Sequence, residues 1–312
     1  MTRVLAKYEN GNYRVTLLSN GTKIRETIDP NATVFKPERP ETCDLSITDF
    51  CDLGCSFCYM GCTEKGEHAD IEGSMDFLGS IPSGTEIAIG GGSPILHPGF
   101  ESLLGYFNAR GIISNVTVHK AHVLRYFSKL LTYSNNELLW GIGVSMASYD
   151  QDAAIMISHL PHSVFHVIAG IISADDIEKL ANFGVPILIL GYKNKGRAKY
   201  ETLPESVEYK IRSLKDRMPA LLASNKCVVS FDNLALQQLD IKSIVPEKEW
   251  QECYMGDDGL TGEFDSASFY VDLTNKKFAM NSVEAKQYAF SESAGTFTGM
   301  YNFLKGKAQC AK

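Results

Sequence analysis

The order of apolar and polar residues along the chain predicts a sheet of parallel strands. Between residues 43 and 191, short apolar runs alternate with stretches in which apolar residues recur at helical spacing. This alternation is typical of βαβ units, whose strands lie parallel in a sheet that is either open or barrel-like. We expect strands over 44–48, 86–89, 113–118, 139–145, 164–169 and 185–190. Helices are expected between them over 71–80, 98–110, 121–132, 149–157 and 174–183.

The two ends of the chain follow other patterns. The turn dipeptides Asn10-Gly11 and Asn20-Gly21 separate strand-like runs at 4–8, 13–18 and 22–28, which predicts a small β-meander, either a structural lid or a recognition module. Prolines make 30–42 an extended connector. After residue 200 we expect a helix over 206–222, a seventh strand over 226–231, a hairpin of 268–273 and 277–280, and a helix over 295–305. The chain is thus expected to comprise units 1–42, 43–200 and 201–312.

Three cysteines follow the first predicted strand within eight residues. Cys51, Cys55 and Cys58 have the spacing C-x3-C-x2-C. Thiolates are soft ligands suited to iron–sulfur clusters, zinc or cuprous copper, and this spacing lets one loop wrap a single metal centre. Three ligands would leave one iron of a four-iron cluster open, whereas electron-transfer clusters use four cysteines. The alternatives are a zinc knuckle that lacks its fourth ligand and three unrelated buried thiols.

This motif resembles the signature of the radical S-adenosylmethionine (SAM) superfamily, C-x3-C-x-aromatic-C, with Phe57 as the aromatic residue. After the second strand, Gly90-Gly91-Gly92-Ser93-Pro94 resembles the superfamily's G-G-E-P element, although Ser93 stands where glutamate is most common. The resemblance implies a partial (β/α)6 barrel with a small N-terminal β-meander and a C-terminal α+β extension. It also implies a [4Fe–4S] cluster on the three cysteines, whose open iron binds SAM. The SAM site would include Phe57, Gly91, Gly92, Ser93 and Pro94.

Further candidate residues lie at the ends of later strands. Ser145 matches the place where superfamily members put a polar residue near the SAM ribose, and Ile168 lies in a segment that resembles their adenine-lining G-x-I-x-G. Tight packing at Ser145 and a core position at Ile168 are the alternatives. The sixth strand opens into three cations, which suit the carboxylate of SAM or a substrate anion, or form a solvated basic loop. These cations are Lys193, Lys195 and Arg197.

Composition restricts the setting in which this chemistry takes place. The 312 residues are 44% hydrophobic and 21% charged, with no signal-peptide pattern and no apolar run near the roughly 20 residues that span a bilayer. We therefore expect a cytoplasmic protein whose eight cysteines are reduced. The net charge of −7 argues against non-specific nucleic-acid binding. The cysteines outside the motif are expected to be inert buried side chains, with an auxiliary cluster, or a hydrogen-atom donor at Cys253, as alternatives. These are Cys43, Cys62, Cys227, Cys253 and Cys310.

The predicted function follows from the resemblance. A radical SAM enzyme takes one electron from an external reductant of flavodoxin or ferredoxin type and cleaves SAM to methionine and a 5′-deoxyadenosyl radical. That radical then abstracts hydrogen from a substrate C–H bond. The preferred substrate is a peptide or protein, and the alternative is a small anionic metabolite or nucleotide. A non-catalytic iron–sulfur or zinc protein is the remote alternative. No catalytic side chain is predicted, except that His119, at the end of the third strand, is either a structural histidine or a proton-transfer group.

Overall fold

A computed structural model describes residues 2–32, 34–253, 266–284 and 286–310 of the chain. Its centre is a sheet of ten strands in the order β10-β9-β8-β7-β6-β5-β4-β11-β12-β13. All six predicted barrel strands are confirmed, and so is the seventh, which pairs in parallel with the sixth. These seven strands are β4 (Thr42–Ser46), β5 (Glu86–Gly90), β6 (Ile113–His119), β7 (Gly141–Met146), β8 (Ser163–Ile168), β9 (Ile187–Leu190) and β10 (Val229–Phe231).

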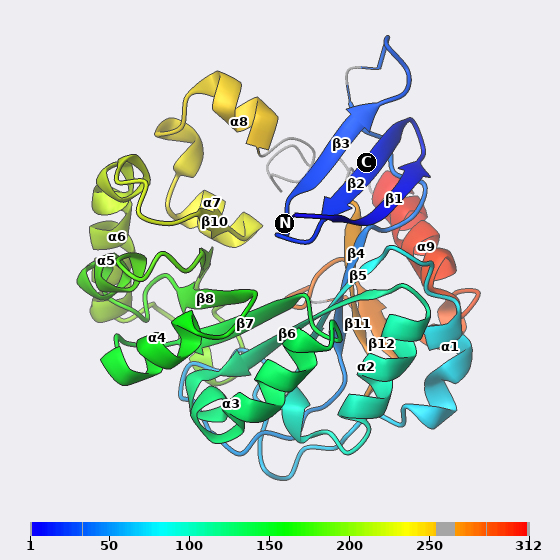
Figure 1. Ribbon diagram of the computed structural model, residues 1–312, viewed down its shortest axis with the longest axis horizontal. Coiled ribbons are helices and arrows are strands. Elements are labelled where there is room, and N and C mark those ends of the chain that lie inside the picture. Colours follow the sequence, from blue (N-terminus) through cyan, green and yellow to red (C-terminus); the bar gives the residue numbers. More distant parts are fainter. Residues whose placement is uncertain (1, 33, 254–265, 285, 311–312) are drawn as a thin grey trace.

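The strand order explains the curvature of this sheet. From β4 to β10 each strand lies beside the one before it in the chain, so right-handed crossovers place every connecting helix on the same face. Figure 1 shows these helices around the outside of the curved sheet. Alternate strand residues, such as Ile87 and Ile89, are fully buried beneath the helices, and the others face the hollow of a partial barrel. The helices are α1 (Met75–Gly79), α2 (Phe100–Ala109), α3 (Lys120–Asn135), α4 (Gln151–Ser158), α5 (Ala174–Ala181) and α6 (Glu205–Ala223).

The C-terminal part of the chain extends the sheet on its other edge. The predicted hairpin is confirmed as β11 (Ser268–Asp272) and β12 (Lys277–Ala279), and β11 pairs in parallel with β4. The sequence did not reveal three short elements, β13 (Tyr288–Ala289), α7 (Asn233–Gln238) and α8 (Glu247–Cys253). The last helix, α9 (Phe297–Cys310), confirms the predicted closing helix, but it begins two residues later and ends five residues later than predicted. None of the described helices has the length and apolar run that crossing a bilayer requires.

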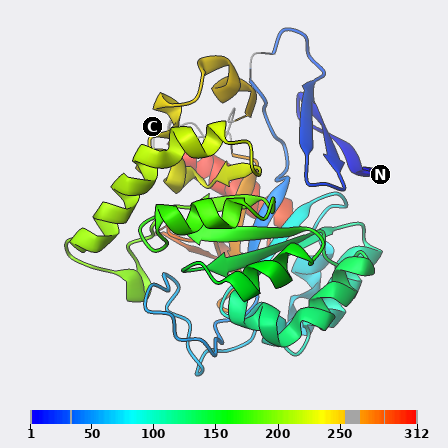
Figure 2. The same ribbon diagram turned by 60° about the vertical axis from the view of Figure 1, so that its left-hand side comes forward.

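The predicted meander forms a separate three-stranded antiparallel sheet of β1 (Val4–Asn10), β2 (Tyr13–Leu18) and β3 (Lys23–Thr27). Glu41, which is 0% exposed, fastens it to the barrel. The Glu41 carboxylate accepts hydrogen bonds from the Tyr13 hydroxyl at 2.5 Å and from Arg25 Nη2 at 2.9 Å, and Lys23 Nζ lies 3.3 Å away. Burial alone would raise the pKa of Glu41, but the bonds and charges of these partners lower it. Figure 2 shows the meander at the opposite end of the barrel from the loop that follows β4.

Candidate functional site

The cysteine motif lies in the loop after β4, at the carboxyl ends of the parallel strands. This is the end of a barrel where catalytic loops gather. Cys51 is buried, whereas Cys55 and Cys58 are half-buried. The loop is closed on itself, because the Cys51 amide donates to the carbonyl of Thr63 at 2.9 Å and the Cys58 amide to that of Cys55 at 3.2 Å.

The three thiols face one another closely enough to interact. Burial raises the pKa of Cys55, and the charges of Cys51 and Cys58 raise it further. The thiol of Cys62 donates a hydrogen bond to Cys58 and thereby lowers the pKa of the Cys58 thiol. Among the described residues, no three His, Cys, Asp or Glu side chains close around a point that could hold one metal ion.

The glycine-rich turn after β5 packs directly on the cysteine loop. The Gly92 amide donates to the Thr48 carbonyl and the Ser93 amide to the Phe50 carbonyl, both at 2.7 Å. Thr48 and Phe50 lead into the first cysteine of the motif. The two motifs found in the sequence therefore build one site.

The three glycines of this turn differ in what surrounds the position that a side chain would occupy. Gly91 has φ +114°, and a Cβ there would lie 2.3 Å from the carbonyl oxygen of Thr48. A Cβ at Gly92 would lie 2.1 Å from the carbonyl oxygen of Phe50. Both positions are therefore glycine because the cysteine loop lies against them. Gly90 differs, since nothing lies within 4 Å of its Cβ position. It is thus the glycine of the turn that leaves room for a ligand, and the sequence alone did not single it out.

A polar network joins the glycine turn to the cysteine loop. Ser93 is fully buried, and its hydroxyl lies 3.5 Å from Cys51 Sγ and 3.1 Å from Asp52 Oδ1. Asp52 also accepts from His122 Nε2 at 2.8 Å and from Arg125 Nη1 at 3.0 Å. Burial would raise the pKa of Asp52, but the hydrogen bonds from His122 and Ser93 lower it. Sequence reasoning missed this network, although an acidic residue inside the motif was a signal for it.

Pro94 is buried behind the turn and begins the short 3-10 helix Pro94–Leu96. A proline is suited to the first position of a helix, where its missing N–H leaves no bond unmade. The turn therefore keeps a fixed direction as the chain leaves β5.

Arg197 fastens the loop after β9 to the cysteine loop. Its Nε donates to the Cys55 carbonyl at 2.9 Å, its Nη1 to the Cys62 carbonyl at 2.8 Å, and its own amide to the Cys58 carbonyl at 2.9 Å. A Cβ at Gly196 would lie 2.3 Å from the Tyr59 carbonyl oxygen, which shows how closely the two loops pack. Arg197 Nη2 is buried and has no partner among the described residues. An unpaired cationic donor beside three thiols suits an anionic group such as an iron–sulfur cluster or a carboxylate.

The two lysines of the same segment have partners on the protein. Lys193 Nζ lies 4.4 Å from the ring centre of Tyr59 and 3.5 Å from Ser282 Oγ. Lys195 Nζ donates to the Ser282 carbonyl at 3.4 Å. The predicted basic segment is therefore bound to the cysteine loop and to the C-terminal part of the chain. A role for it in holding an anion stays a prediction.

A crevice of about 40 Å³ brings together residues from distant parts of the chain. Phe57 lies in the cysteine motif, Ile168 ends β8, and Leu190 and Lys193 lie at the end of β9. The aromatic residue and the isoleucine that the resemblance assigned to SAM thus lie on the same wall. Ile168 is only partly buried, as a ligand-contacting residue would be.

Ser145 and His119 lie side by side across β6 and β7, in register with each other. The amide of Ala121 donates to His119 Nδ1 at 3.2 Å, so this histidine caps α3. That contact gives His119 a structural role. Ser145 lies beside it, half-buried at the end of β7, and a contact to SAM stays a prediction for it.

The cysteines outside the motif differ in their burial. Cys43 is fully buried in β4, and burial raises the pKa of its thiol. Cys227 is half-buried and free. The side chains of Cys253 and Cys310 lie outside the described residues, as does the acidic segment that follows Cys253.

No protein-family model matches the sequence, and no curated protein is similar to it. Solved structures do resemble its fold. SuiB of Streptococcus suis, bound to S-adenosylmethionine, superposes with a TM-score of 0.54 at 12% identity. The alignment covers 82% of this chain and 62% of SuiB. anSMEcpe, with bound AdoMet and the Cp18Cys peptide, gives a TM-score of 0.51 at 14% identity over 78% of this chain and 75% of that protein. Both are radical SAM enzymes.

The chain has the fold of SuiB and anSMEcpe. The predicted partial barrel is confirmed by these structures and by the parallel sheet. At such identities the likeness concerns the fold, and the chain spans less than two thirds of the length of SuiB. Within the radical SAM fold, the residue bounds of the three predicted units stay a prediction.

Proposed function

We propose that this protein is a radical SAM enzyme that modifies a peptide. The observation that carries the proposal is the packing of the glycine turn on the cysteine loop, through the 2.7 Å bonds from Gly92 and Ser93. Gly91 and Gly92 let the turn pack on the cysteine loop, and Gly90 beside them leaves open backbone that SAM could approach. In this chain both motifs follow the carboxyl ends of two adjacent parallel strands, β4 and β5, which supports the proposal.

The residues present fit both cofactors. Cys51, Cys55 and Cys58 would hold a [4Fe–4S] cluster, and the buried, unpaired Nη2 of Arg197 suits its negative charge. SAM would lie over Gly90, between the glycine turn and the crevice of Phe57 and Ile168. When bound, the two cofactors supply a 5′-deoxyadenosyl radical that takes hydrogen from the substrate. The role of the protein is to hold the cysteine loop rigid and to keep water away from the carbon that carries the radical.

A peptide is favoured over a small anion because the basic segment already has protein partners. Arg197 donates to two carbonyls of the cysteine loop, and Lys193 and Lys195 contact Ser282. anSMEcpe has been solved with a bound peptide, at a TM-score of 0.51 to this chain. The reductant in this proposal is an external flavodoxin or ferredoxin, and the compartment is the reducing cytoplasm. The described cysteines are all free thiols, which is consistent with that compartment.

Deuterium transfer would test the substrate class. Cells that express the protein are grown in deuterated medium and separated into a peptide fraction and a small-molecule fraction. Each fraction is incubated with reduced enzyme and unlabelled SAM, and the mass of the released 5′-deoxyadenosine is measured. We expect deuterium from the peptide fraction. Transfer from the small-molecule fraction alone would contradict peptide modification and favour the metabolite alternative.

A further inference from the structure

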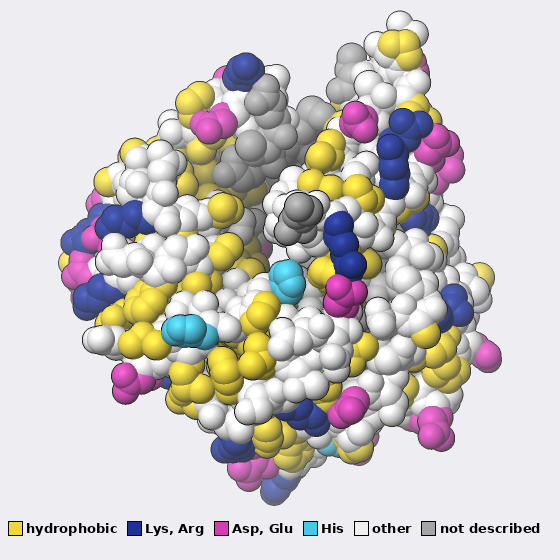
Figure 3. Space-filling view, viewed as in Figure 1, with side chains coloured by type: hydrophobic (Ala, Val, Ile, Leu, Met, Phe, Trp, Pro, Cys, Tyr) yellow, Lys and Arg dark blue, Asp and Glu magenta, His cyan; other side chains and the backbone are white. Residues whose placement is uncertain are grey.

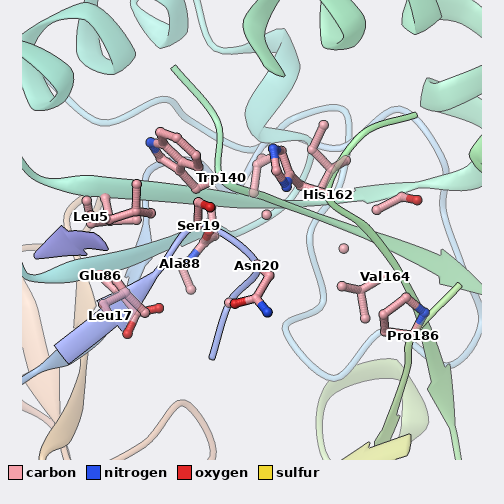
Figure 4. Close-up of a pocket in the computed structure, with 18 of the residues that line it drawn as sticks. Leu5, Leu17, Ser19, Asn20, Glu86, Ala88, Trp140, His162, Val164 and Pro186 are labelled. Carbon is pink, nitrogen blue, oxygen red and sulfur yellow. The ribbon is translucent and has the colours of Figure 1, made fainter. Parts of the chain in front are cut away.

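A cavity of about 350 Å³ lies inside the barrel, at the end opposite the cysteine loop. Its walls come from the first residues of β5 to β8 and from the turn between β2 and β3. Figure 4 shows Glu86, Trp140 and Val164 of the barrel opposite Ser19 and Asn20 of that turn. In the space-filling view, hydrophobic side chains and a histidine gather near the centre of this face, beside the meander (Figure 3). The volume lies at the small end of the range for ligand pockets.

Strand β7 has glycine at two positions that face this cavity, Gly141 and Gly143. A Cβ at Gly143 would lie 2.1 Å from Cε1 of His166, and a Cβ at Gly141 would lie 2.6 Å from Oδ1 of Asn115. The two glycines leave space that polar side chains of the adjacent strands occupy. A strand glycine often marks such a close approach. The cavity is therefore shaped around Asn115 and His166.

Both of these polar side chains lack a protein partner. Neither forms a hydrogen bond or an ion pair within the described part of the chain. Burial lowers the pKa of His166 to about 4, so its imidazole is neutral at physiological pH and carries one donor and one acceptor. Asn115 and His166 are half-buried, so each presents polar atoms to the cavity with which a bound group could pair. Two such side chains without protein partners on one cavity wall therefore suit a polar ligand.

The cavity is close to neutral. Its one carboxylate, Glu86, pairs with Lys23 of the meander at 2.5 Å. No lysine or arginine is among the described residues that line it. The remaining wall is apolar or carries hydroxyl, amide and imidazole groups, as at Thr117, Asn20 and His162. Burial lowers the pKa of His162 as it does that of His166, which favours the neutral imidazole. An anionic or cationic group would lose its hydration here without gaining a partner.

Strand β8 connects this cavity with the proposed SAM site. Ile168 lies in the upper crevice, whereas His166 and Val164 line the cavity below it on the same face of the strand. Two residues along a strand advance by about 6.6 Å. A side chain bound next to His166 would therefore lie roughly 6.6 Å below the level of Ile168, and the neighbouring part of the same peptide could extend toward the proposed SAM site.

We propose that this cavity binds an uncharged polar side chain of the substrate peptide, an amide or a hydroxyl, through Asn115 and His166. The β2–β3 turn, Ser19 to Gly21, forms its outer wall and gives the meander a role in recognition. This inference rests on the proposed function for the identity of the substrate as a peptide. The binding of the side chain can be measured without cluster or SAM.

Tryptophan fluorescence offers the direct test, because Trp140 lines the cavity. Capped Gly-Gly-X-Gly-Gly peptides with X as Asn, Gln or Ser are titrated into the protein, beside peptides with Asp, Lys or Leu. We expect a saturable change with the amide or hydroxyl peptides, at an affinity at least about tenfold higher than for the charged ones. The Trp140→Phe variant should lose the signal. Binding that is equal for all peptides, or absent for the polar ones, would overturn the inference.

Two variants assign the contact. Asn115→Leu should weaken binding of the amide peptide at least about tenfold, because one hydrogen-bonding partner on the cavity wall is lost. Gly143→Ala should do the same by displacing the His166 ring. Exposed His159, on the outside of the barrel, gives the matched control His159→Ala. Thermal unfolding of each variant identifies any that fail to fold. If either Asn115→Leu or Gly143→Ala does not fold, the affinity of the other one tests the assignment. An unchanged affinity in a folded Asn115→Leu or Gly143→Ala protein refutes the assignment. Iron content and 5′-deoxyadenosine release test the proposed function separately.

Discussion

The guanidinium of Arg197 donates to the carbonyl oxygen of Cys55 at 2.9 Å, across 142 residues of chain. This bond and its neighbour to Cys62 connect the last strands of the barrel to the loop that would hold the cluster. The shape of the proposed metal site thus depends on a residue far from the motif.

Replacing Arg197 by Lys should therefore affect the cysteine loop itself. A lysine can replace one of the two side-chain bonds but not the planar pair. We expect the free energy of unfolding to fall by about 1–3 kcal/mol. Iron retained after anaerobic reconstitution and desalting should fall with it. Lys199→Ala, at an exposed position two residues on, is the control. Full iron retention in Arg197→Lys would contradict the conclusion that Arg197 holds the cysteine loop in place.

The glycine turn permits a matched pair of variants. Gly92→Ala places a methyl group 2.1 Å from the Phe50 carbonyl oxygen, so it should displace the cysteine loop and lower both stability and iron content. Gly90→Ala points its methyl group into open space. It should keep iron at the wild-type value and weaken SAM binding, measured by equilibrium dialysis, by about tenfold. If Gly90→Ala binds SAM as tightly as wild type, SAM does not lie over that residue.

The anchor of the meander should depend on pH. The pKa of Glu41 is lowered in the folded chain, so its contribution to stability is present above the unfolded value of about 4.3 and is lost as pH falls through the folded value. Glu41→Gln should cost about 2–3 kcal/mol at pH 7, measured by urea unfolding. The difference from wild type should shrink below about pH 4. Glu26→Gln, at an exposed position of β3, is the control. A difference that does not change with pH would mean that the ion pair is not its cause.

The sequence predicted well what depends on local pattern. The barrel strands follow from short apolar runs between helical stretches, and the ends of the six predicted strands shift by two residues or fewer. The cysteine motif and the glycine turn were readable because their residues are adjacent in the chain.

The features of the fold and of the site that the sequence could not predict depend on contacts between distant residues. The direction of the missing Cβ at Gly92, toward the carbonyl oxygen of Phe50, can be seen only in the packed structure. The partners of Arg197 and the pairing of β11 with β4 likewise join segments that no local pattern connects. The sequence did contain a signal for His166, because a histidine in a mostly apolar strand is expected to face something other than the core.

The most direct test of the central claim combines iron and product in one preparation. Protein reconstituted anaerobically should hold about four irons per chain and, once reduced by dithionite in the presence of SAM, should release 5′-deoxyadenosine. The triple variant Cys51→Ala, Cys55→Ala, Cys58→Ala should fold and lose both. A wild-type protein that holds the cluster but releases no 5′-deoxyadenosine, or a triple variant that keeps a full cluster, would contradict the account.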